Sequence, residues 1–181
     1  LLLLIGFASF SAVAALSPFQ EKVLATLKME HRTEADTIRD YNRDPIYALE
    51  FFGLKEDMKV IEFAPGNGWY SKILAPLLKD QGELHLAYPE EWLKNMDDLL
   101  ALEPMNKAKK LPIALDWNDK EQQYQLGNLD FAMKDADMLL NIREYHNFDA
   151  QDKAKLNKAT FAALKPGGIY VIVDHSRRHM A

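Results

Sequence analysis

The 181-residue chain contains no cysteine. Disulfide bonds, thiolate metal ligands, cysteine nucleophiles and a lipid-anchoring cysteine are therefore excluded. The chain also has no long basic run and carries a net charge of −5, so we expect no nucleic-acid partner. Its most apolar run, residues 1–10, is too short to span a bilayer as a helix. What remains is ordinary globular composition, with 48% apolar and 27% charged residues in one chain of single-domain length.

The first residues differ in kind from the rest. Residues 1–10 are almost all apolar, and small residues ending in Ala12-Val13-Ala14 follow. This order is typical of the apolar region and cleavage site of a secretory signal peptide, although a charged start and a methionine are absent. We interpret residues 1–15 as a signal peptide without its front, and expect export to a bacterial periplasm with no membrane span after its removal. A buried first helix is the alternative, which the missing polar face disfavours.

Two helices are predicted before the first strand. Apolar spacing predicts one over residues 17–27 and another over residues 45–52, with Pro45 in its first turn and Gly53 as its C-cap. The expected apolar face of the second helix consists of Leu49, Phe51 and Phe52. The predicted organisation is then: signal peptide, 1–15; N-terminal helices, 16–52; α/β domain, 53–181.

The centre of the chain is the stretch VIEFAPGNGWY, Val60 to Tyr70. An apolar strand ends there in a glycine turn, and residues 71–78 continue at helical spacing. Gly66 and Gly68 remove side chains that would keep a ligand from the backbone, and the helix behind them points free N–H groups at it. Glu62, near the strand end, can accept hydrogen bonds from ligand amines. The pattern favours a ligand site, with a ligand-free tight turn as the alternative.

Two common nucleotide motifs do not match this turn. The dinucleotide fingerprint requires glycine where Ser71 stands, which disfavours a nicotinamide oxidoreductase. A phosphate-binding loop requires lysine directly after its last glycine, and Trp69 follows Gly68.

Strands and helices alternate downstream of the turn. The expected strands are Glu83–Tyr88, Leu111–Leu115, Asp137–Ile142 and Ile169–Val173. Helices are expected over residues 91–102 and from Asp149 to Leu164, where Lys165-Pro166-Gly167-Gly168 ends the second one. Its inward residues are expected to be Leu156, Thr160, Phe161 and Leu164. The alternation predicts an α/β fold with a mostly parallel sheet and helices on both faces.

Two motifs give the chain a family resemblance. An acid followed by three alternate positions (Glu62, Ala64, Gly66, Gly68) and the LKPGG turn before the fifth strand resemble class I S-adenosylmethionine-dependent methyltransferases. More narrowly, residues 32–76, 141–148 and 157–176 look like exported bacterial proteins described only as predicted methyltransferases. The resemblance implies a Rossmann-like methyltransferase sandwich, S-adenosylmethionine as cofactor and an unidentified methyl acceptor. Because that fold normally adds two strands, it also implies truncation after strand five, which would lie near an open edge.

The resemblance assigns cofactor-binding positions to this chain. Ala64 stands where the family has its first glycine, and Tyr88, with Glu90 just beyond it, stands where the family has an acid for the ribose. Asp116 would meet the adenine amino group, and Asn141 the methionine amino group or the substrate. The implied cofactor-binding residues are Glu62, Ala64, Gly66, Gly68, Tyr88, Asp116 and Asn141.

The polar cluster NIREYHNF after the fourth strand is the catalytic candidate. Ligands of open α/β sheets bind at the carboxyl ends of the strands. There His146 would accept a proton from the substrate, and Tyr145 would line the methyl site. Asp174 and His175 would orient His146 or contact substrate. Imidazole and carboxylate groups also suit zinc or iron, but no metal-binding spacing supports a metal site, and none is predicted.

The sequence therefore predicts a methyltransferase acting on a small-molecule or periplasmic acceptor. The alternative is a periplasmic binding or accessory protein that kept the fold and lost catalysis. Ala64 and Tyr88 favour the alternative, whereas Glu62, Gly66 and Gly68 oppose it.

Overall fold

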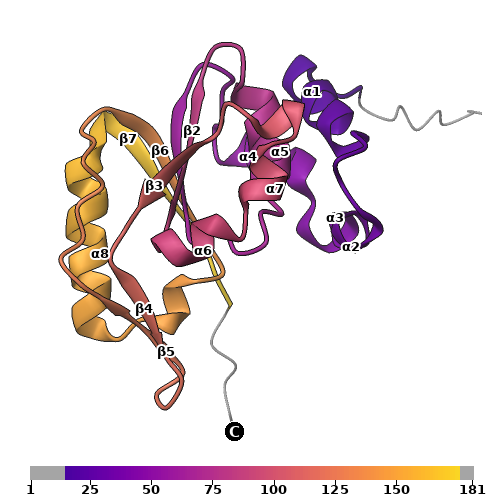
Figure 1. The fold of residues 1–181 in the computed structure, drawn as a ribbon. Helices are drawn as coiled ribbons and strands as arrows, with labels where there is room; N and C mark the ends of the chain where they lie inside the picture. Colours follow the sequence, from indigo (N-terminus) through magenta and orange to yellow (C-terminus); the bar gives the residue numbers. More distant parts are fainter. Residues whose placement is uncertain (1–14, 176–181) are drawn as a thin grey trace, which may run out of the picture.

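The computed structural model describes residues 15–175, so the predicted signal segment lies almost entirely outside the described residues. Its centre is a parallel sheet in the order β3-β2-β1-β6-β7 (Figure 1). The strands are β1 (Lys59–Phe63), β2 (Glu83–Tyr88), β3 (Lys109–Pro112), β6 (Ala136–Ile142) and β7 (Leu164–Val173). No helix within residues 15–175 combines the length and apolar character needed to cross a bilayer. The α/β fold predicted from the sequence is confirmed.

The strand order reverses beside β1. The chain moves outward from β1 to β2 and β3, then returns to the other side of β1 to add β6 and β7. Phe63, the last residue of β1, pairs with Ala87 of β2 and with Asn141 of β6. The carboxyl ends of β1, β2 and β6 are therefore level, and a reversal of this kind opens a crevice beyond them.

The two-residue period of the strands builds two cores. Val60, Leu86 and Leu140 pack toward α1 (Pro18–Leu27), α4 (Pro45–Phe51) and α5 (Ser71–Leu78). Ile61, Phe63 and Leu139 pack toward α8 (Ala150–Ala163) and the hairpin of β4 (Leu115–Asn118) and β5 (Gln123–Leu126). Figure 1 shows α8 on one side of the sheet and α1, α4 and α5 on the other. Both faces are covered, as continuous apolar strands of a parallel sheet require.

Short helices complete the fold. They are α2 (Glu34–Thr37), α3 (Asp40–Arg43), α6 (Glu90–Lys94), α7 (Asp97–Leu100) and the 3₁₀ turns η1 (Glu103–Met105) and η2 (Tyr145–Asn147). Helix α1 starts with a capping box: the Ser17 hydroxyl accepts from the Gln20 N–H, and the Gln20 side chain accepts from the Ser17 N–H.

The region after β2 differs from the prediction. The expected third strand over residues 111–115 is two strands of different sheets, because β3 ends at Pro112 and Leu115 begins β4, which pairs with β5 as an antiparallel hairpin. The expected helix over residues 91–102 is broken into α6 and α7 around Met96.

Two aromatic residues predicted to face inward are exposed instead. Phe51 is 89% exposed and Phe161 is 84% exposed. On α8 the buried residues include Leu156, Thr160 and Ala163, and one further step along a helix turns a side chain by about 100° from Thr160. The prediction that Phe161 faces inward was therefore wrong, because it relied on the apolar character of the side chain and not on its position around the helix. The predicted Asp149 N-cap is confirmed, since its carboxylate accepts from the Asp152 N–H.

Strand β7 begins earlier than expected. It includes the Lys165–Gly168 turn, which forms a bulge where one residue of β6, Asp137, is opposed by four of β7. Among the strands of residues 15–175, β7 is hydrogen-bonded only to β6 and lies at the edge of the sheet, as predicted from the strand count.

Candidate functional site

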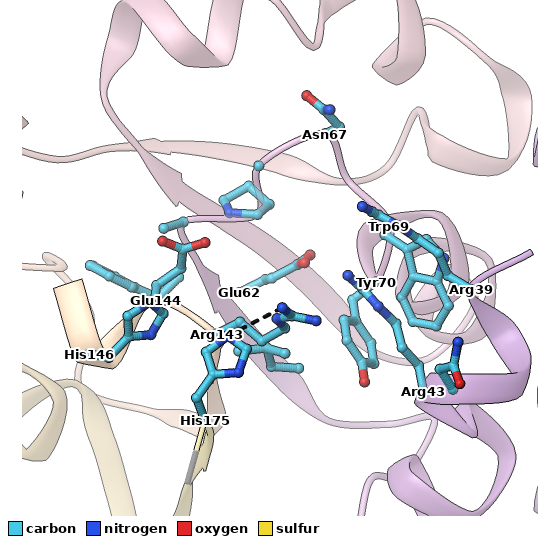
Figure 2. A pocket seen from close by; sticks show the side chains of 16 residues that line it. Arg39, Arg43, Glu62, Asn67, Trp69, Tyr70, Arg143, Glu144, His146 and His175 are labelled. Carbon is cyan, nitrogen blue, oxygen red and sulfur yellow. Dashed lines mark hydrogen bonds between the residues drawn. The ribbon is translucent and has the colours of Figure 1, made fainter. Parts of the chain in front are cut away.

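A cavity of about 590 Å³ lies beyond the carboxyl end of β1, which is within the ordinary range of small-ligand sites. Its wall comes from three parts of the chain: the α2–α3 region, the β1–α5 turn, and the ends of β6 and β7. Figure 2 shows Glu144, His146 and His175 on one side and Trp69, Tyr70, Arg39 and Arg43 on the other, with Arg143 between them. The strand-order reversal predicted a crevice here, and the cavity occupies it.

The β1–α5 turn places three alternate residues in the left-handed region. The φ angles are +49° at Ala64, +58° at Gly66 and +73° at Gly68. A side chain added to Gly66 would meet no protein atom within 4 Å, so this backbone faces open space in the cavity. A side chain added to Gly68 would come within 2.9 Å of Leu99. Gly66 thus leaves room for a ligand, whereas Gly68 permits helix packing.

Glu62 is buried at the base of the cavity. The Ser71 hydroxyl donates to its Oε2 at 2.6 Å. Burial raises the pKa of Glu62 to about 8, even though hydrogen bonds from the Ser71 side chain and backbone favour the charged form. At neutral pH this carboxyl holds its proton for most of the time, and a cation bound beside it would release that proton.

His146 forms a pair with Asp174. The His146 Nδ1 lies 2.7 Å from Asp174 Oδ1. Burial alone would raise the pKa of Asp174, but hydrogen bonds from the His175 backbone and from His146 hold it below its usual value. An ionised carboxylate can only accept, so Nδ1 carries the hydrogen and Nε2 of a neutral His146 can accept a proton.

His175 is held differently. An Arg143 guanidinium nitrogen lies 3.2 Å from the His175 Nε2, so the guanidinium donates and that ring nitrogen accepts. One ligand atom each from His146, Asp174 and His175 lie within 4.8 Å of one another, a spacing that a metal ion could use. The guanidinium occupying His175 Nε2 opposes a cation there by its charge.

A hydrogen bond and an ion pair connect the α2–α3 side of the cavity wall to the start of α5. The Trp69 indole donates to the Asp36 carbonyl at 2.8 Å, and Lys72 pairs with the Asp36 carboxylate at 2.7 Å. The buried Arg32 donates two hydrogen bonds to the carboxylate of Asp40, the first residue of α3. These contacts set the position of Arg43, whose guanidinium stacks on the Trp69 ring at 4.4 Å.

The structure brings only some of the predicted site residues to the cavity. Glu62, Ala64, Gly66 and His146 line it. Asn141 lies on the opposite face of β6, where its amide donates to the Tyr170 hydroxyl at 3.4 Å. The two-residue period explains the difference, since Asn141 pairs with Phe63 and shares its face, while Glu62 lies on the other.

The remaining predicted residues also lie off the cavity wall. Tyr88 packs edge-on against Trp92 with ring centroids 4.8 Å apart. Asp116 is exposed on β4, opposite Gln125, so the correction of the third strand removes it from the site. The Tyr145 hydroxyl accepts from Asn157 Nδ2 at 3.0 Å. Gly68 faces α7.

Sequence reasoning missed Arg39 and Arg43 of the cavity wall, and it placed Arg143 among the polar residues at the strand ends without giving it a role. Arg143 was inside the cluster NIREYHNF and at a strand end, so its position carried a signal. Arg39 and Arg43 precede the first strand, and the approach of α3 to β6 and β7 has no counterpart in the local sequence pattern.

The parallel strand order, the glycine turn and the crevice define a Rossmann-like methyltransferase fold. Comparison with solved structures agrees. A SAM dependent methyltransferase from Aquifex aeolicus superimposes with a TM-score of 0.59 at 19% identity, covering 90% of this chain and 77% of that one. A protein from Pyrococcus horikoshii OT3 gives 0.58 at 16%, covering 88% and 62%.

A third similar structure is longer than this chain. An O-methyltransferase family protein from Burkholderia thailandensis gives a TM-score of 0.51 at 16% identity, and the match covers 76% of this chain but only 38% of that protein. No known family model matches the sequence, and no curated protein matches it. The likeness therefore establishes the fold, shared with S-adenosylmethionine-dependent methyltransferases.

Proposed function

We propose that this protein binds S-adenosylmethionine and transfers its methyl group to a small acceptor. The observation that carries the proposal is the cavity at the end of β1, into which the Gly66 backbone opens beside the buried carboxyl of Glu62. The shared fold supports it, because open α/β sheets bind nucleotides at this position.

The residues of the turn fit an adenosyl cofactor with a cationic amino-acid group. Gly66 and Ala64 would place main chain against it, and Glu62 would accept from its ammonium. The cofactor, when bound, supplies an electrophilic methyl group. Glu62 would release its own proton to solvent when the ammonium binds, so the base of the cavity would stay neutral.

His146 is the proposed proton acceptor. Asp174 holds its Nδ1, so Nε2 is the free nitrogen on a ring that lines the cavity. As the acceptor's oxygen or nitrogen forms its bond to the methyl carbon, the carbon–sulfur bond of the cofactor would break to leave a neutral thioether, and the proton that the acceptor atom loses would pass to Nε2. Asp174 stabilises the imidazolium that results.

Titration calorimetry with S-adenosylhomocysteine tests the binding step. We expect the parent chain to bind and Gly66→Val to lose binding, because the valine would fill ligand space and strain a backbone at φ +58°. Gly167→Val is the matched control, because Gly167 also has a positive φ (+81°) and free space around it but lies outside the cavity, and this variant should bind. A parent chain that fails to bind at millimolar ligand would overturn the proposal.

A binding or accessory role without catalysis is the second candidate. One observation favours it: within residues 15–175, no carboxylate from β2 or α6 lines the cavity, so the usual ribose acid is not replaced by Glu90 or Glu91. A bound ligand without methyl transfer to any acceptor would be the expected result.

Export is a further part of the proposal and is supported by the apolar segment and the Ala12-Val13-Ala14 site. Expression of the complete reading frame in a Gram-negative host, followed by mass spectrometry of the periplasmic fraction, should find a chain starting near residue 15. An uncleaved chain in the cytoplasm would contradict it.

A further inference from the structure

Three guanidinium groups converge on the cavity. Arg39, Arg43 and Arg143 all line it, and among residues 15–175 none of the three forms an ion pair with a carboxylate. Arg32, by contrast, is held by both oxygens of Asp40. Such a concentration of cations is unexpected in a chain of net charge −5, and it marks this wall as a place for an anion.

The acids near these arginines are already engaged. Asp174 is hydrogen-bonded to His146, and Glu144 accepts from Asn147 at 3.0 Å. Burial raises the pKa of Glu62 to about 8, so it contributes little negative charge at neutral pH. Asp174 lines a smaller adjoining hollow and Glu144 the larger cavity, but the three guanidinium groups outnumber these two acids, so the wall keeps a net positive charge.

A second, smaller hollow adjoins the cavity. It measures about 220 Å³ and lies between α3 and the ends of β6 and β7. Arg43 and Arg143 line both spaces, as does His175, whereas Arg39 lines the larger one alone. Arg43 and Arg143 thus belong to the wall that the two spaces share, and Asp174 lines the smaller one.

The two shared arginines are held in place before any ligand arrives. Arg43 stacks on Trp69, and Arg143 contacts His175 from a backbone with φ +67°. Burial, followed by the nearby charges of Arg39 and Arg143, lowers the pKa of Arg43. An oxyanion between the guanidinium groups would relieve this repulsion and receive charge-assisted hydrogen bonds.

We propose that Arg43 and Arg143 form an oxyanion site in the smaller hollow, and that the methyl acceptor is a small molecule with a carboxylate or phosphate group bound there. The acceptor role rests on the proposed methyl transfer, whereas the oxyanion site does not. A single guanidinium group can form two parallel hydrogen bonds to the cofactor's one carboxylate. Arg39, which lines the larger cavity, would provide that guanidinium group. Two arginines remain for a second anion.

Titration calorimetry with inorganic phosphate and with succinate, at constant ionic strength, tests the site. The parent chain should bind at least one of them, and the outcome separates phosphate from carboxylate chemistry. The double variant Arg43→Gln/Arg143→Gln should bind about tenfold to a hundredfold more weakly, the loss expected for charged hydrogen bonds. Lys94→Gln on α6, an exposed cation outside both spaces, is the matched control and should bind normally.

The same titration on protein saturated with S-adenosylhomocysteine separates this inference from the proposed function. Anion binding that persists supports a separate acceptor site. Anion binding that disappears would assign both arginines to the cofactor's own carboxylate and overturn the inference. If S-adenosylhomocysteine does not bind but the anion does, the proposed methyl transfer is contradicted and the proposed oxyanion site is supported.

Two further results would overturn the site itself. One is an absence of binding by the parent chain to either anion. The other is equal binding by the double variant, provided that its circular dichroism and thermal midpoint match the parent. Arg143→Lys, which keeps the charge and loses the fork, should recover part of the lost affinity.

Discussion

At the scale of single residues, the site depends on a carboxyl group that the fold keeps neutral. Glu62 is 5% exposed and its pKa is raised from 4.5 to about 8 by burial. Between pH 4.5 and about 8, Glu62 holds a proton in the folded protein that it releases in the unfolded chain. The free energy of unfolding therefore falls as pH rises through this range, and below and above it the contribution of Glu62 does not change with pH.

Glu62→Gln should remove that dependence. We expect the variant and the parent to have similar stability near pH 4.5, and the variant to become relatively more stable as pH rises toward 8. Urea unfolding at a series of pH values measures the difference in the free energy of unfolding. The surface variant Glu103→Gln should show no such trend, and an equal trend in both variants would contradict the assignment.

The pair His146–Asp174 gives a second expectation at this scale. His146→Ala should leave the dissociation constant of S-adenosylhomocysteine nearly unchanged and lower turnover by about 10²–10⁴, the range for loss of a general base. Asp174→Asn keeps the imidazole and should lower turnover less. Formation of the demethylated cofactor with an identified acceptor is the readout. Unchanged turnover in His146→Ala would remove it from the mechanism.

At the scale of elements, local sequence signals were sufficient for β1, β2, α5 and α8. Their signals are local: each consists of residues that are neighbours in the sequence, namely alternating apolar residues, a glycine turn or an N-cap. These elements begin and end within a residue or two of the predicted bounds. The β4–β5 hairpin was missed because Ile113 and Leu115 read as one apolar strand. Both are buried, but the chain changes sheets between them.

The cap of α8 offers a direct test of one such signal. Asp149→Ala removes the acceptor for the Asp152 N–H and should lower the free energy of unfolding by about 1 kcal/mol. Asp119→Ala, in the exposed turn between β4 and β5, should change it little. Denaturant midpoints at pH 7 compare the two, and equal effects would show that capping is not the cause.

The same limits explain the site predictions. Glu62, Gly66 and His146 line the cavity, and the sequence indicated them because they lie at or just after strand ends, which are visible in the sequence. Asn141 does not line the cavity, because successive side chains of a strand point to opposite faces and Asn141 shares the face of Phe63. Arg39 and Arg43, at the two ends of α3, were missed because the approach of this helix to β6 depends on tertiary packing through Trp69 and Asp36.

At the scale of the whole molecule, the N-terminal helices share a core with the sheet. Val23 of α1 and Leu49 of α4 are fully buried in the same cluster as Ile73 and Leu74 of α5. We therefore expect residues 16–52 and the sheet to unfold together.

Leu49→Ala tests this expectation. Loss of a fully buried leucine should cost about 2–5 kcal/mol. In a Trp92→Phe/Trp117→Phe background, where Trp69 beside the N-terminal helices is the remaining tryptophan, fluorescence and far-ultraviolet circular dichroism should shift together to lower denaturant. Phe51→Ala on the exposed side of the same helix is the control and should have little effect. Two separate transitions would show that the helices fold independently.

The cavity wall joins Arg39 and Arg43, which precede the first strand, to His146 and His175, more than a hundred positions later in the chain. Any occupant that contacts both sides becomes a cross-link without a covalent bond. Amide hydrogens in α3 and at the end of β7 should then exchange more slowly in concert, although the chain itself provides no hydrogen bond between them in the described residues. Binding of a ligand in the cavity could thus be detected as slower amide hydrogen exchange in two segments that are far apart in the sequence.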